Sequence, residues 1–289
     1  MEPVRLGLIG CGVIGRHHAH AASQCAAVRL VAVADLIEER GQAIAEQYAV
    51  PRRYREGLDL LDDPRVEAVI LALPACGRLV LALKAFGNGK HVLTEKPVAM
   101  SAADVVTMIK ARGNLVATCG PARPRFTAAM QQVTGFIAGG ALGTLRMLNC
   151  RAVTSPAGPP QSPPPTWRLR SAENGGGILV NWGCYDLDYL LGLTGWSVTP
   201  RTVLARTWRV PPTYEPYIAP NSDAETHVAA LILCDGGAVI SYERSEYATA
   251  RAESMWQITG DKASLHLNMI AGKEYTVTLD RATADGGTV

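Results

Sequence analysis

The stretch "VRLGLIGCGVIG", Val4–Gly15, decides the fold. Its first seven residues are mostly apolar and have the length of a buried strand. After them, Gly10, Gly12 and Gly15 form the pattern G-x-G-x-x-G, where we expect a helix to begin at about Ile14. Glycines in this pattern allow a tight turn and a close approach of backbone N–H groups to a pyrophosphate, and the helix N-terminus adds partial positive charge. The stretch therefore predicts a strand, a phosphate-binding turn and a helix.

An acidic residue follows the glycines at the distance expected of a dinucleotide site. The next predicted strand, Val28–Asp35, ends on this acid about 20 residues further on. Asp35 could bind both hydroxyls of the adenosine ribose, and no Arg or Ser follows it directly to receive a 2′-phosphate, so we expect NAD in preference to NADP. Asp35 and Glu38 also resemble a capping box, so Asp35 could instead start a helix, and the two roles are compatible.

Strand and helix patterns alternate over residues 1–120, which we expect to form the first domain. Repeated strand–helix units imply a doubly wound parallel sheet with helices on both faces. The further strands are expected at Val66–Leu73, His91–Lys96 and Leu115–Cys119, with a helix at Ser101–Arg112.

Residues 121–289 have a different pattern and are expected to form a second, α+β domain. A helix at Phe126–Ala138 and a strand at Thr144–Val153 precede a proline-rich segment that reads as an exposed loop. Later strand-like runs are separated by turns such as "CDGGA" and "TGDKA", which favour antiparallel hairpins. We therefore expect one open, mostly antiparallel sheet.

A polar stripe runs along the helix expected in "GGGILVNWGCYDLDYLLGL", residues 175–193. Asn181, Tyr185 and Asp188 are spaced to share one helix face. Asp186 projects about 100° away from its neighbour and is expected to pair elsewhere.

Composition argues against several classes of function. The net charge of +2 gives no electrostatic reason to expect nucleic acid or an anionic membrane as a partner. The seven cysteines are scattered, which is typical of reduced thiols in a cytoplasmic protein, and the first residues do not form a signal peptide. His17, His18 and His20 are close in sequence, but no nearby carboxylate or cysteine completes a metal site, so we expect none.

Four segments, "GCGVIG", "LALP", "GKHVLTEKPVAMS" and "GGGILVNWGCYDLDYL", occur in an order that resembles the Gfo/Idh/MocA family, the glucose–fructose oxidoreductase and inositol dehydrogenase group. The resemblance covers nearly the whole chain. It implies an N-terminal Rossmann domain and a C-terminal α/β domain whose open sheet often forms oligomer contacts. It also implies hydride transfer between a nicotinamide and a hydroxyl carbon, usually on a sugar or cyclitol.

The resemblance assigns a role to Glu95-Lys96-Pro97, at the end of a predicted strand. Lys96 matches the active-site lysine of the family. Ligands of such sheets bind beyond the carboxyl ends of the strands, where an ammonium can hydrogen-bond the substrate oxygen. Glu95 and Pro97 are expected to shape the turn, with a cis Lys96–Pro97 bond. The alternative is a surface lysine before a proline turn.

The second motif departs from the family, in which many members have Asp, three residues, then His on this helix. Here Asn181 and Tyr185 take these places. Asn cannot take up a proton, whereas Tyr can exchange one, and a nearby Lys96 ammonium would favour the phenolate. We expect Tyr185 as acid/base and Asn181 as a group that orients substrate. The alternative is that both lie at a domain interface with their hydrogen bonds satisfied.

The remaining expected site residues fall into two groups. Those expected to contact the cofactor, besides the three glycines and Asp35, are Val13, Ile14, Leu36, Leu73, Pro74, Glu95 and Arg123. Those expected to contact substrate are Trp167, Arg168 and Asp188. Trp167 and Arg168 could equally tether the proline-rich loop. Arg78 stands where many members of the family have a His near the cofactor.

These observations predict an NAD-dependent oxidoreductase that acts on a hydroxyl or carbonyl carbon of a sugar, sugar derivative or cyclitol. One alternative is a nicotinamide-binding sensor or regulator that has lost catalysis, motivated by the missing Asp and His. Another is an enzyme that cleaves a glycoside through oxidation, elimination and re-reduction on a permanently bound NAD. We expect a homo-dimer or homo-tetramer formed through the C-terminal sheet.

Overall fold

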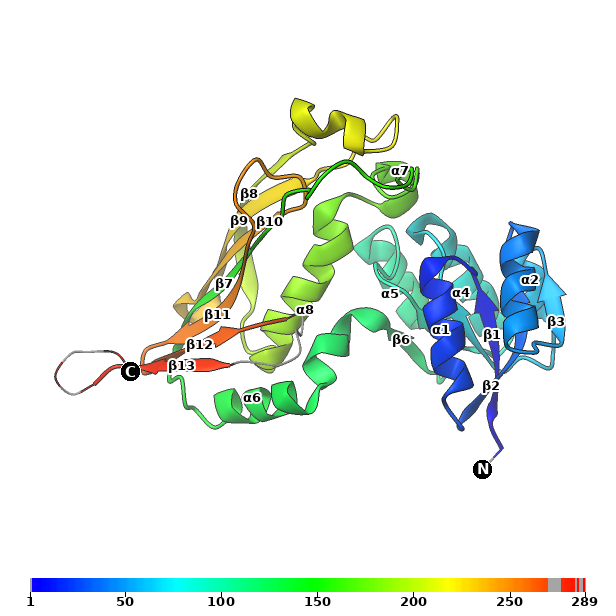
Figure 1. The fold of residues 1–289 in the computed structure, drawn as a ribbon. Helices are drawn as coiled ribbons and strands as arrows, with labels where there is room; N and C mark the ends of the chain where they lie inside the picture. Colours follow the sequence, from blue (N-terminus) through cyan, green and yellow to red (C-terminus); the bar gives the residue numbers. More distant parts are fainter. Residues whose placement is uncertain (1, 270–276, 284, 286–287, 289) are drawn as a thin grey trace. The chain divides into compact units, whose positions relative to one another are not determined.

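The computed structural model describes residues 2–269, 277–283, 285 and 288, and of residues 121–123 only the backbone. The chain divides into two compact units (Figure 1). Unit 1 comprises Met1–Gly120 with Ala172–Gly175, and unit 2 comprises Pro121–Ser171 with Gly176–Val289.

Unit 1 contains a six-stranded sheet in the order β3-β2-β1-β4-β5-β6, and every adjacent pair is parallel. This confirms the predicted parallel sheet. The strands are β1 (Val4–Ile9), β2 (Val28–Ala34), β3 (Arg52–Tyr54), β4 (Ala68–Leu71), β5 (His91–Thr94) and β6 (Ala117–Cys119). β3 is not among the predicted strands, because three residues that include two arginines show no strand periodicity.

Helices cover both faces of this sheet, as predicted. On one face α1 (Val13–Ser23) and α2 (Glu38–Gln47) enclose a core with Ala19 and Ile44. On the other face Leu60, Ala82 and Met108 belong to a second core. They lie on α3 (Gly57–Asp62), α4 (Arg78–Gly87) and α5 (Ala102–Ala111). Burial on both faces explains why the strands of unit 1 read as continuous apolar runs.

Unit 2 contains a seven-stranded sheet in the order β13-β12-β11-β7-β10-β9-β8. Only the β7–β10 pair is parallel, so the sheet is open and mostly antiparallel, as predicted. The strands are β7 (Leu145–Val153), β8 (Pro200–Trp208), β9 (His227–Cys234), β10 (Val239–Ser245), β11 (Glu253–Gly260), β12 (Ala263–Leu267) and β13 (Thr278–Arg281).

The helices α6 (Ala128–Ala138) and α8 (Cys184–Leu193) pack against the sheet of unit 2 (Figure 1). Tyr189, Leu190 and Leu193 of α8 are fully buried in the core that the helices share with the sheet. The residues before α8 form a π-helix, Leu179–Gly183, which continues directly into it. α7 is a single turn at Ser171–Asn174.

Asp186 connects α8 to the sheet by buried polar contacts. Its carboxylate accepts hydrogen bonds from Tyr242 Oη at 3.1 Å, from Trp256 Nε1 at 3.1 Å and from Arg244 Nη1 at 3.5 Å. Burial raises the pKa of Asp186, while the Arg244 guanidinium and these donors act against the rise. Asp186 thus pairs away from the polar stripe, as the helix geometry predicted.

The glycines before α8 are required by a close backbone approach. A Cβ at Gly177 would lie only 1.7 Å from the Glu225 carbonyl oxygen. The Glu225 carboxylate in turn accepts hydrogen bonds from the backbone N–H groups of Gly177 at 2.9 Å and Leu179 at 3.2 Å. A negative charge at the start of a helix stabilises it, so Glu225 fixes where this helical segment begins.

We predict that Gly177→Ala lowers the unfolding free energy of unit 2 by about 3 kcal/mol, because the added methyl cannot fit against Glu225 without moving backbone. Chemical denaturation measures the loss. Gly135→Ala is the control, since a Cβ there meets nothing within 4 Å, and alanine in the interior of α6 should stabilise by about 0.5–1 kcal/mol. A Gly177→Ala protein as stable as the wild type would contradict the close contact.

Candidate functional site

Each of the three motif glycines in unit 1 meets a different spatial demand. Gly10 has φ of +95°, and a Cβ there would lie 2.3 Å from the Ala72 carbonyl oxygen. A Cβ at Gly15 would lie 2.1 Å from the Gly10 carbonyl oxygen, so helix α1 packs directly on the turn. Gly12 differs, because a Cβ there would meet nothing within 4 Å.

The open side of Gly12 fits a phosphate group. Gly12 is the N-cap of α1, where no side chain caps the helix and the first turn carries no acidic residue. The first backbone N–H groups of a helix have no partners within the helix, and together with its dipole they favour an anion. The turn therefore has the space, the donors and the charge that the pyrophosphate of a dinucleotide requires.

Asp35 ties the end of β2 to the glycine turn. Its Oδ2 accepts a hydrogen bond from the Cys11 backbone N–H at 2.7 Å, and its Oδ1 accepts one from the Ile37 backbone N–H at 2.8 Å. Helix α2 begins at Glu38 with Ile37 as its N-cap and no side-chain cap, so the alternative capping box does not form. Burial raises the pKa of the Cys11 thiol to about 12, so the group beside Asp35 is neutral.

The apolar residues expected around the cofactor lie near this turn. Val13 is 79% exposed and Leu36 is 63% exposed, although both are large apolar side chains. Ile14 instead packs partly into the core beside α1. Leu73 and Pro74 follow β4, and the Leu73 backbone N lies 3.3 Å from the position of a Cβ on Gly10. Val13 and Leu36 therefore leave exposed apolar surface of the kind that lines small-molecule sites.

The Glu95-Lys96-Pro97 turn follows β5 at the same edge of the sheet. The Lys96–Pro97 peptide bond is cis, as the motif predicted. Glu95 is buried, and its Oε2 accepts a hydrogen bond from the Lys96 backbone N–H at 3.2 Å. His18 Nε2 on α1 lies 2.9 Å from Glu95 Oε1. The buried Glu95 side chain therefore supports the turn by binding the backbone N–H of Lys96. Lys96 itself is half-buried.

Arg78 holds the backbone on both sides of Lys96. Its guanidinium is buried and donates hydrogen bonds to the carbonyl oxygens of Glu95 and Pro97. It also donates to the Leu73 carbonyl oxygen, from Nε at 2.9 Å and from Nη2 at 2.6 Å. One side chain at the start of α4 thus joins the segment after β4 to the lysine turn after β5.

Sequence reasoning missed the roles that His18 and Arg78 have here. The sequence presents His18 only as a candidate metal ligand and Arg78 only as a residue near the cofactor. His18 and Glu95 are 77 residues apart, and Arg78 reaches from α4 to the turn after the next strand, so no local pattern indicates either contact. Across the described ranges 2–269 and 277–283 and residues 285 and 288, no three His, Cys, Asp or Glu side chains are grouped to hold a metal ion.

In unit 2, the polar stripe of Asn181, Tyr185 and Asp188 begins in a π-helix. Asn181 lies in the π-helix and Tyr185 in the first turn of α8. Tyr185 is only 7% exposed, and its ring centroid lies 5.5 Å from that of Trp182. The Arg244 guanidinium stacks on the other aromatic ring of this pair, 4.5 Å from the Trp182 centroid. π-helical turns inside α-helices occur frequently at functional sites, and no pattern in the sequence predicts this one.

Asp188 forms a two-point ion pair inside unit 2. Arg125 Nε lies 2.7 Å from Asp188 Oδ2, and Arg125 Nη2 lies 3.2 Å from Oδ1. The side chain of Arg123, which the sequence predicts as a cofactor contact, lies outside the described part of the structure. Arg125 lies three residues before α6 begins at Ala128, and no pattern in the sequence indicates its ion pair with Asp188.

Arg168 forms an ion pair with Glu246, just after β10. Burial raises the pKa of Glu246, and Arg168 counteracts this rise. Trp167, beside it, is 38% exposed. The ion pair fastens the end of the proline-rich loop to the sheet, which is the tethering role that the sequence left open.

Two sequence models match the chain. Residues 4–119 match the GFO_IDH_MocA model, described as an oxidoreductase family with an NAD-binding Rossmann fold. Residues 130–266 match the model of the GFO/IDH/MocA C-terminal domain.

Relatives are similar over different lengths. Inositol 2-dehydrogenase of Rhizobium meliloti is 28% identical over 99% of this chain and 80% of its own length. Myo-inositol 2-dehydrogenase of Thermotoga maritima is 28% identical over 65% of this chain and 55% of its own length. 1,5-Anhydro-D-fructose reductase of Ensifer adhaerens is 30% identical over 64% of this chain and 55% of its own length. The chain thus spans little more than half the length of the last two relatives.

Solved structures share the fold at low identity. Levoglucosan dehydrogenase in complex with NADH and L-sorbose superimposes with a TM-score of 0.81 at 24% identity, over 99% of this chain and 79% of the other. An NAD binding oxidoreductase from Klebsiella pneumoniae superimposes with a TM-score of 0.81 at 24% identity, over 100% of this chain and 79% of the other.

We predict that Arg78→Met lowers the unfolding free energy of unit 1 by about 3 kcal/mol, because three carbonyl oxygens lose a buried charged donor. Denaturation followed by circular dichroism measures the change. Arg53→Met is the control, since Arg53 is exposed and its replacement should cost less than about 0.5 kcal/mol. Equal stability of the two variants would show that Arg78 does not hold the turn.

Proposed function

Because the chain belongs to the Gfo/Idh/MocA family, whose N-terminal domain is an NAD-binding Rossmann fold, we propose that it is an NAD-dependent oxidoreductase. Its substrate is a sugar, a sugar derivative or a cyclitol, and the reaction interconverts a hydroxyl and a carbonyl group. The relatives support this substrate class, since their names specify inositol, 1,5-anhydro-D-fructose and levoglucosan.

The residues of unit 1 fit NAD. Bound at the glycine turn, NAD supplies a nicotinamide that accepts or returns a hydride. Gly12 leaves room for the pyrophosphate, and Asp35 accepts hydrogen bonds from the ribose hydroxyls. Asp35 also repels a 2′-phosphate, which favours NAD over NADP. In this proposal the exposed Val13 and Leu36, together with Leu73 and Pro74, flank the adenosine.

Lys96 polarises the substrate oxygen. Its ammonium donates a hydrogen bond to that oxygen and stabilises negative charge on it as the C–H bond breaks. The observation that carries the proposal is the support around this lysine. Arg78 holds the carbonyl groups before and after it, and Glu95 accepts a hydrogen bond from its backbone N–H. A lysine in a fixed turn is suited to catalysis, because its orientation is set before substrate binds.

Tyr185 exchanges the hydroxyl proton. During oxidation the O–H proton passes to the phenolate of Tyr185 as the hydride leaves carbon, and during reduction both return. Asn181, in the adjoining π-helix, orients the substrate by hydrogen bonds. Trp167 offers an exposed ring to the substrate. Arg168 and Asp188 contribute through the ion pairs that they form with Glu246 and Arg125.

A nicotinamide-binding protein without catalysis is the second candidate. Two observations favour it: Asn181 and Tyr185 replace the usual Asp and His, and Tyr185 is 93% covered by other residues. This candidate predicts NAD binding without hydride transfer to any sugar or polyol.

The proposal also includes a domain boundary and an oligomeric state. We place the domain boundary between Gly120 and Pro121, where the two units divide. A homo-dimer or homo-tetramer forms through the sheet of unit 2. The exposed Leu204 and Leu231 support this, because they pair across β8 and β9 and leave apolar surface in contact with solvent.

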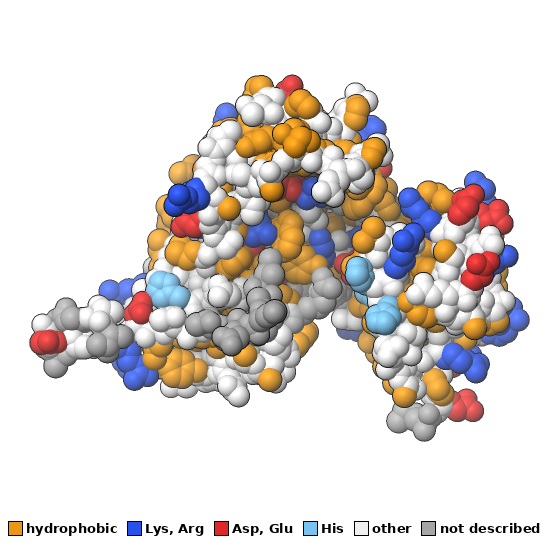
Figure 2. All heavy atoms as spheres, in the orientation of Figure 1, with side chains coloured by type: hydrophobic (Ala, Val, Ile, Leu, Met, Phe, Trp, Pro, Cys, Tyr) orange, Lys and Arg blue, Asp and Glu red, His pale blue; other side chains and the backbone are white. Residues whose placement is uncertain are grey.

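The described part of the chain has no helix that is both long and apolar enough to cross a membrane. Lys and Arg side chains are interspersed with Asp and Glu over the face of unit 1 that Figure 2 shows. A small-molecule substrate is consistent with such a mixed surface.

We predict that Asp35→Ser weakens NADH binding about tenfold, because the ribose hydroxyls lose a charged acceptor, and leaves NADPH binding equal or tighter. Fluorescence titration with each dinucleotide measures both affinities. Glu38→Ser is the control, since it removes a nearby exposed acid that contacts no part of the turn. Parallel losses for NADH and NADPH in Asp35→Ser would contradict the ribose contact.

We predict that Lys96→Ala and Tyr185→Phe each lower turnover at least about tenfold while NADH binding is retained. The assay follows NADH formation with myo-inositol, levoglucosan and related polyols. Tyr189→Phe is the control for Tyr185→Phe, because it removes another hydroxyl from the same buried helix.

Three outcomes separate the candidates. Loss of turnover in both site variants but not in Tyr189→Phe supports the catalytic pair. Unchanged turnover in both removes it. An intact wild-type protein that binds NADH and oxidises none of the polyols supports the second candidate instead.

A further inference from the structure

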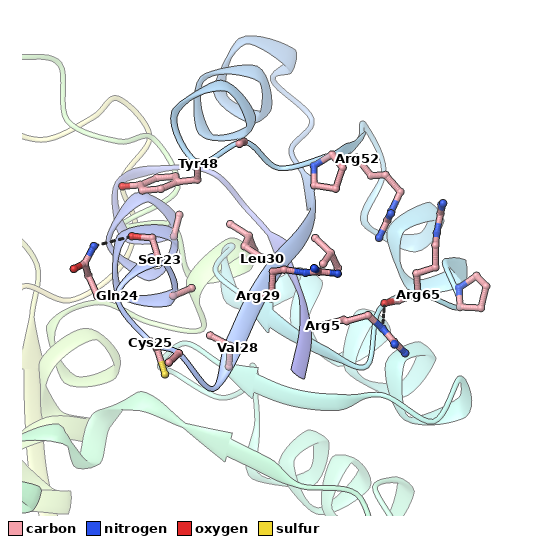
Figure 3. A pocket seen from close by; sticks show the side chains of 17 residues that line it. Arg5, Ser23, Gln24, Cys25, Val28, Arg29, Leu30, Tyr48, Arg52 and Arg65 are labelled. Carbon is pink, nitrogen blue, oxygen red and sulfur yellow. Dashed lines mark hydrogen bonds between the residues drawn. The ribbon is translucent and has the colours of Figure 1, made fainter. Parts of the chain in front are cut away.

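A concave surface lies at the opposite end of the parallel sheet from the glycine turn. This pocket, of about 1080 Å³, is lined by the beginnings of β1 and β2, the end of α1 and the segments around β3 (Figure 3). Four charged side chains line it, and all four are arginines: Arg5, Arg29, Arg52 and Arg65. We call this surface the arginine pocket.

Two carboxylates from outside the lining partly balance these arginines. Glu67 pairs with Arg5 at 3.0 Å. Asp63, whose side chain is 1% exposed, pairs with Arg52 at 2.7 Å and with Arg65 at 2.8 Å. Hydrogen bonds from Arg65 hold the pKa of Asp63 well below its usual range, so it stays ionised. Four guanidinium groups thus face two carboxylates, and an excess of positive charge remains.

One of the two excess charges is shared by Arg52 and Arg65, which pair with the same Asp63, and the other lies on Arg29. Arg29 and Arg5 are register partners on the adjacent parallel strands β2 and β1, so their side chains leave the same face of the sheet. Like charges in such neighbouring positions repel. Glu67 neutralises Arg5, but within the described part of the chain Arg29 has no ion pair or hydrogen bond from its side chain. An anion in the pocket would relieve this repulsion.

The other side of the pocket is neutral. Figure 3 shows the four arginines on one side of β2 and Tyr48, Ser23 and Gln24 on the other. A tyrosine ring with hydroxyl and amide groups offers a stacking surface and neutral hydrogen bonds. The pocket is therefore divided into a cationic part and a part suited to an organic group.

We propose that the arginine pocket binds a phosphate-bearing small molecule. Its phosphate oxygens accept hydrogen bonds from Arg29 and from the remaining N–H groups of Arg5 and Arg65, which match phosphate in charge and geometry. The site is separate from the dinucleotide turn, because the six residues of β1 hold the two ends of the sheet about 20 Å apart. It does not depend on the proposed reaction.

Isothermal titration of the full chain, saturated with NADH, tests this proposal. NADH occupies the dinucleotide site, so added ligand reports a second site. The probes are inorganic pyrophosphate and ADP, at constant ionic strength so that screening does not change. Pyrophosphate tests the arginines alone, and tighter binding of ADP would identify a nucleotide as the class of ligand.

Arg29→Gln should weaken binding of both probes about tenfold, because it removes the one arginine of the pocket whose charge no carboxylate offsets. It should not lower the melting temperature, since its side chain makes no bond to lose. Arg53→Gln is the matched control on the neighbouring strand β3, exposed and outside the pocket, and should leave both affinities within about twofold.

Two results would overturn the proposal. One is the absence of saturable binding of either probe up to about 10 mM, because a specific binding site would have a higher affinity than this limit. The other is an equal loss in Arg29→Gln and Arg53→Gln, which would mean that general surface charge attracts the probes.

Discussion

Close backbone contact at the carboxyl ends of the parallel strands is the constraint on which the candidate site depends. Gly10 lies so near the Ala72 carbonyl that no other residue fits, and this contact fixes the end of β1 beside the end of β4. Asp35 then reaches the turn from the end of β2, and Arg78 connects the segment after β4 to Lys96 after β5. Four strand ends are therefore fixed together before any ligand binds, which is the condition for a site that must hold a dinucleotide and a reacting carbon in register.

Unit 2 also depends on a close backbone contact, made by different residues. The backbone at Gly177 packs on that of Glu225, whose carboxylate also holds the start of the helical segment. Asp186 then anchors α8 to the sheet through Tyr242 and Arg244. Removing one partner from a buried charged cluster leaves an unpaired charge, so such a cluster fixes the orientation of the helix. The turn of helix that carries Tyr185 is thereby held in one rotation relative to the sheet of its own unit.

Local patterns in the sequence predicted much of the fold and the parts of the site that rest on backbone geometry. The glycine turn, Asp35 at the end of a strand and the turn at Lys96 each follow from residues close together in the chain. The contacts of Arg78 with the lysine turn and of His18 with Glu95 could not be predicted, because they join segments that only the tertiary fold brings together. The π-helix before α8 could not be predicted either, because an apolar sequence with a polar stripe is compatible with both an α-helix and a π-helix.

In the proposed reaction, the first unit presents NAD and the ammonium of Lys96, and the second unit supplies the phenol of Tyr185 for proton exchange. The central claim is that a hydride moves between substrate carbon and nicotinamide. Isotope transfer tests it most directly: the protein is incubated with NAD and polyols deuterated at carbon, and the reduced dinucleotide is isolated for mass spectrometry. The account predicts one deuterium in the nicotinamide ring. Unlabelled NADH, or no NADH from a protein that binds NAD and is offered a broad set of polyols, would contradict it.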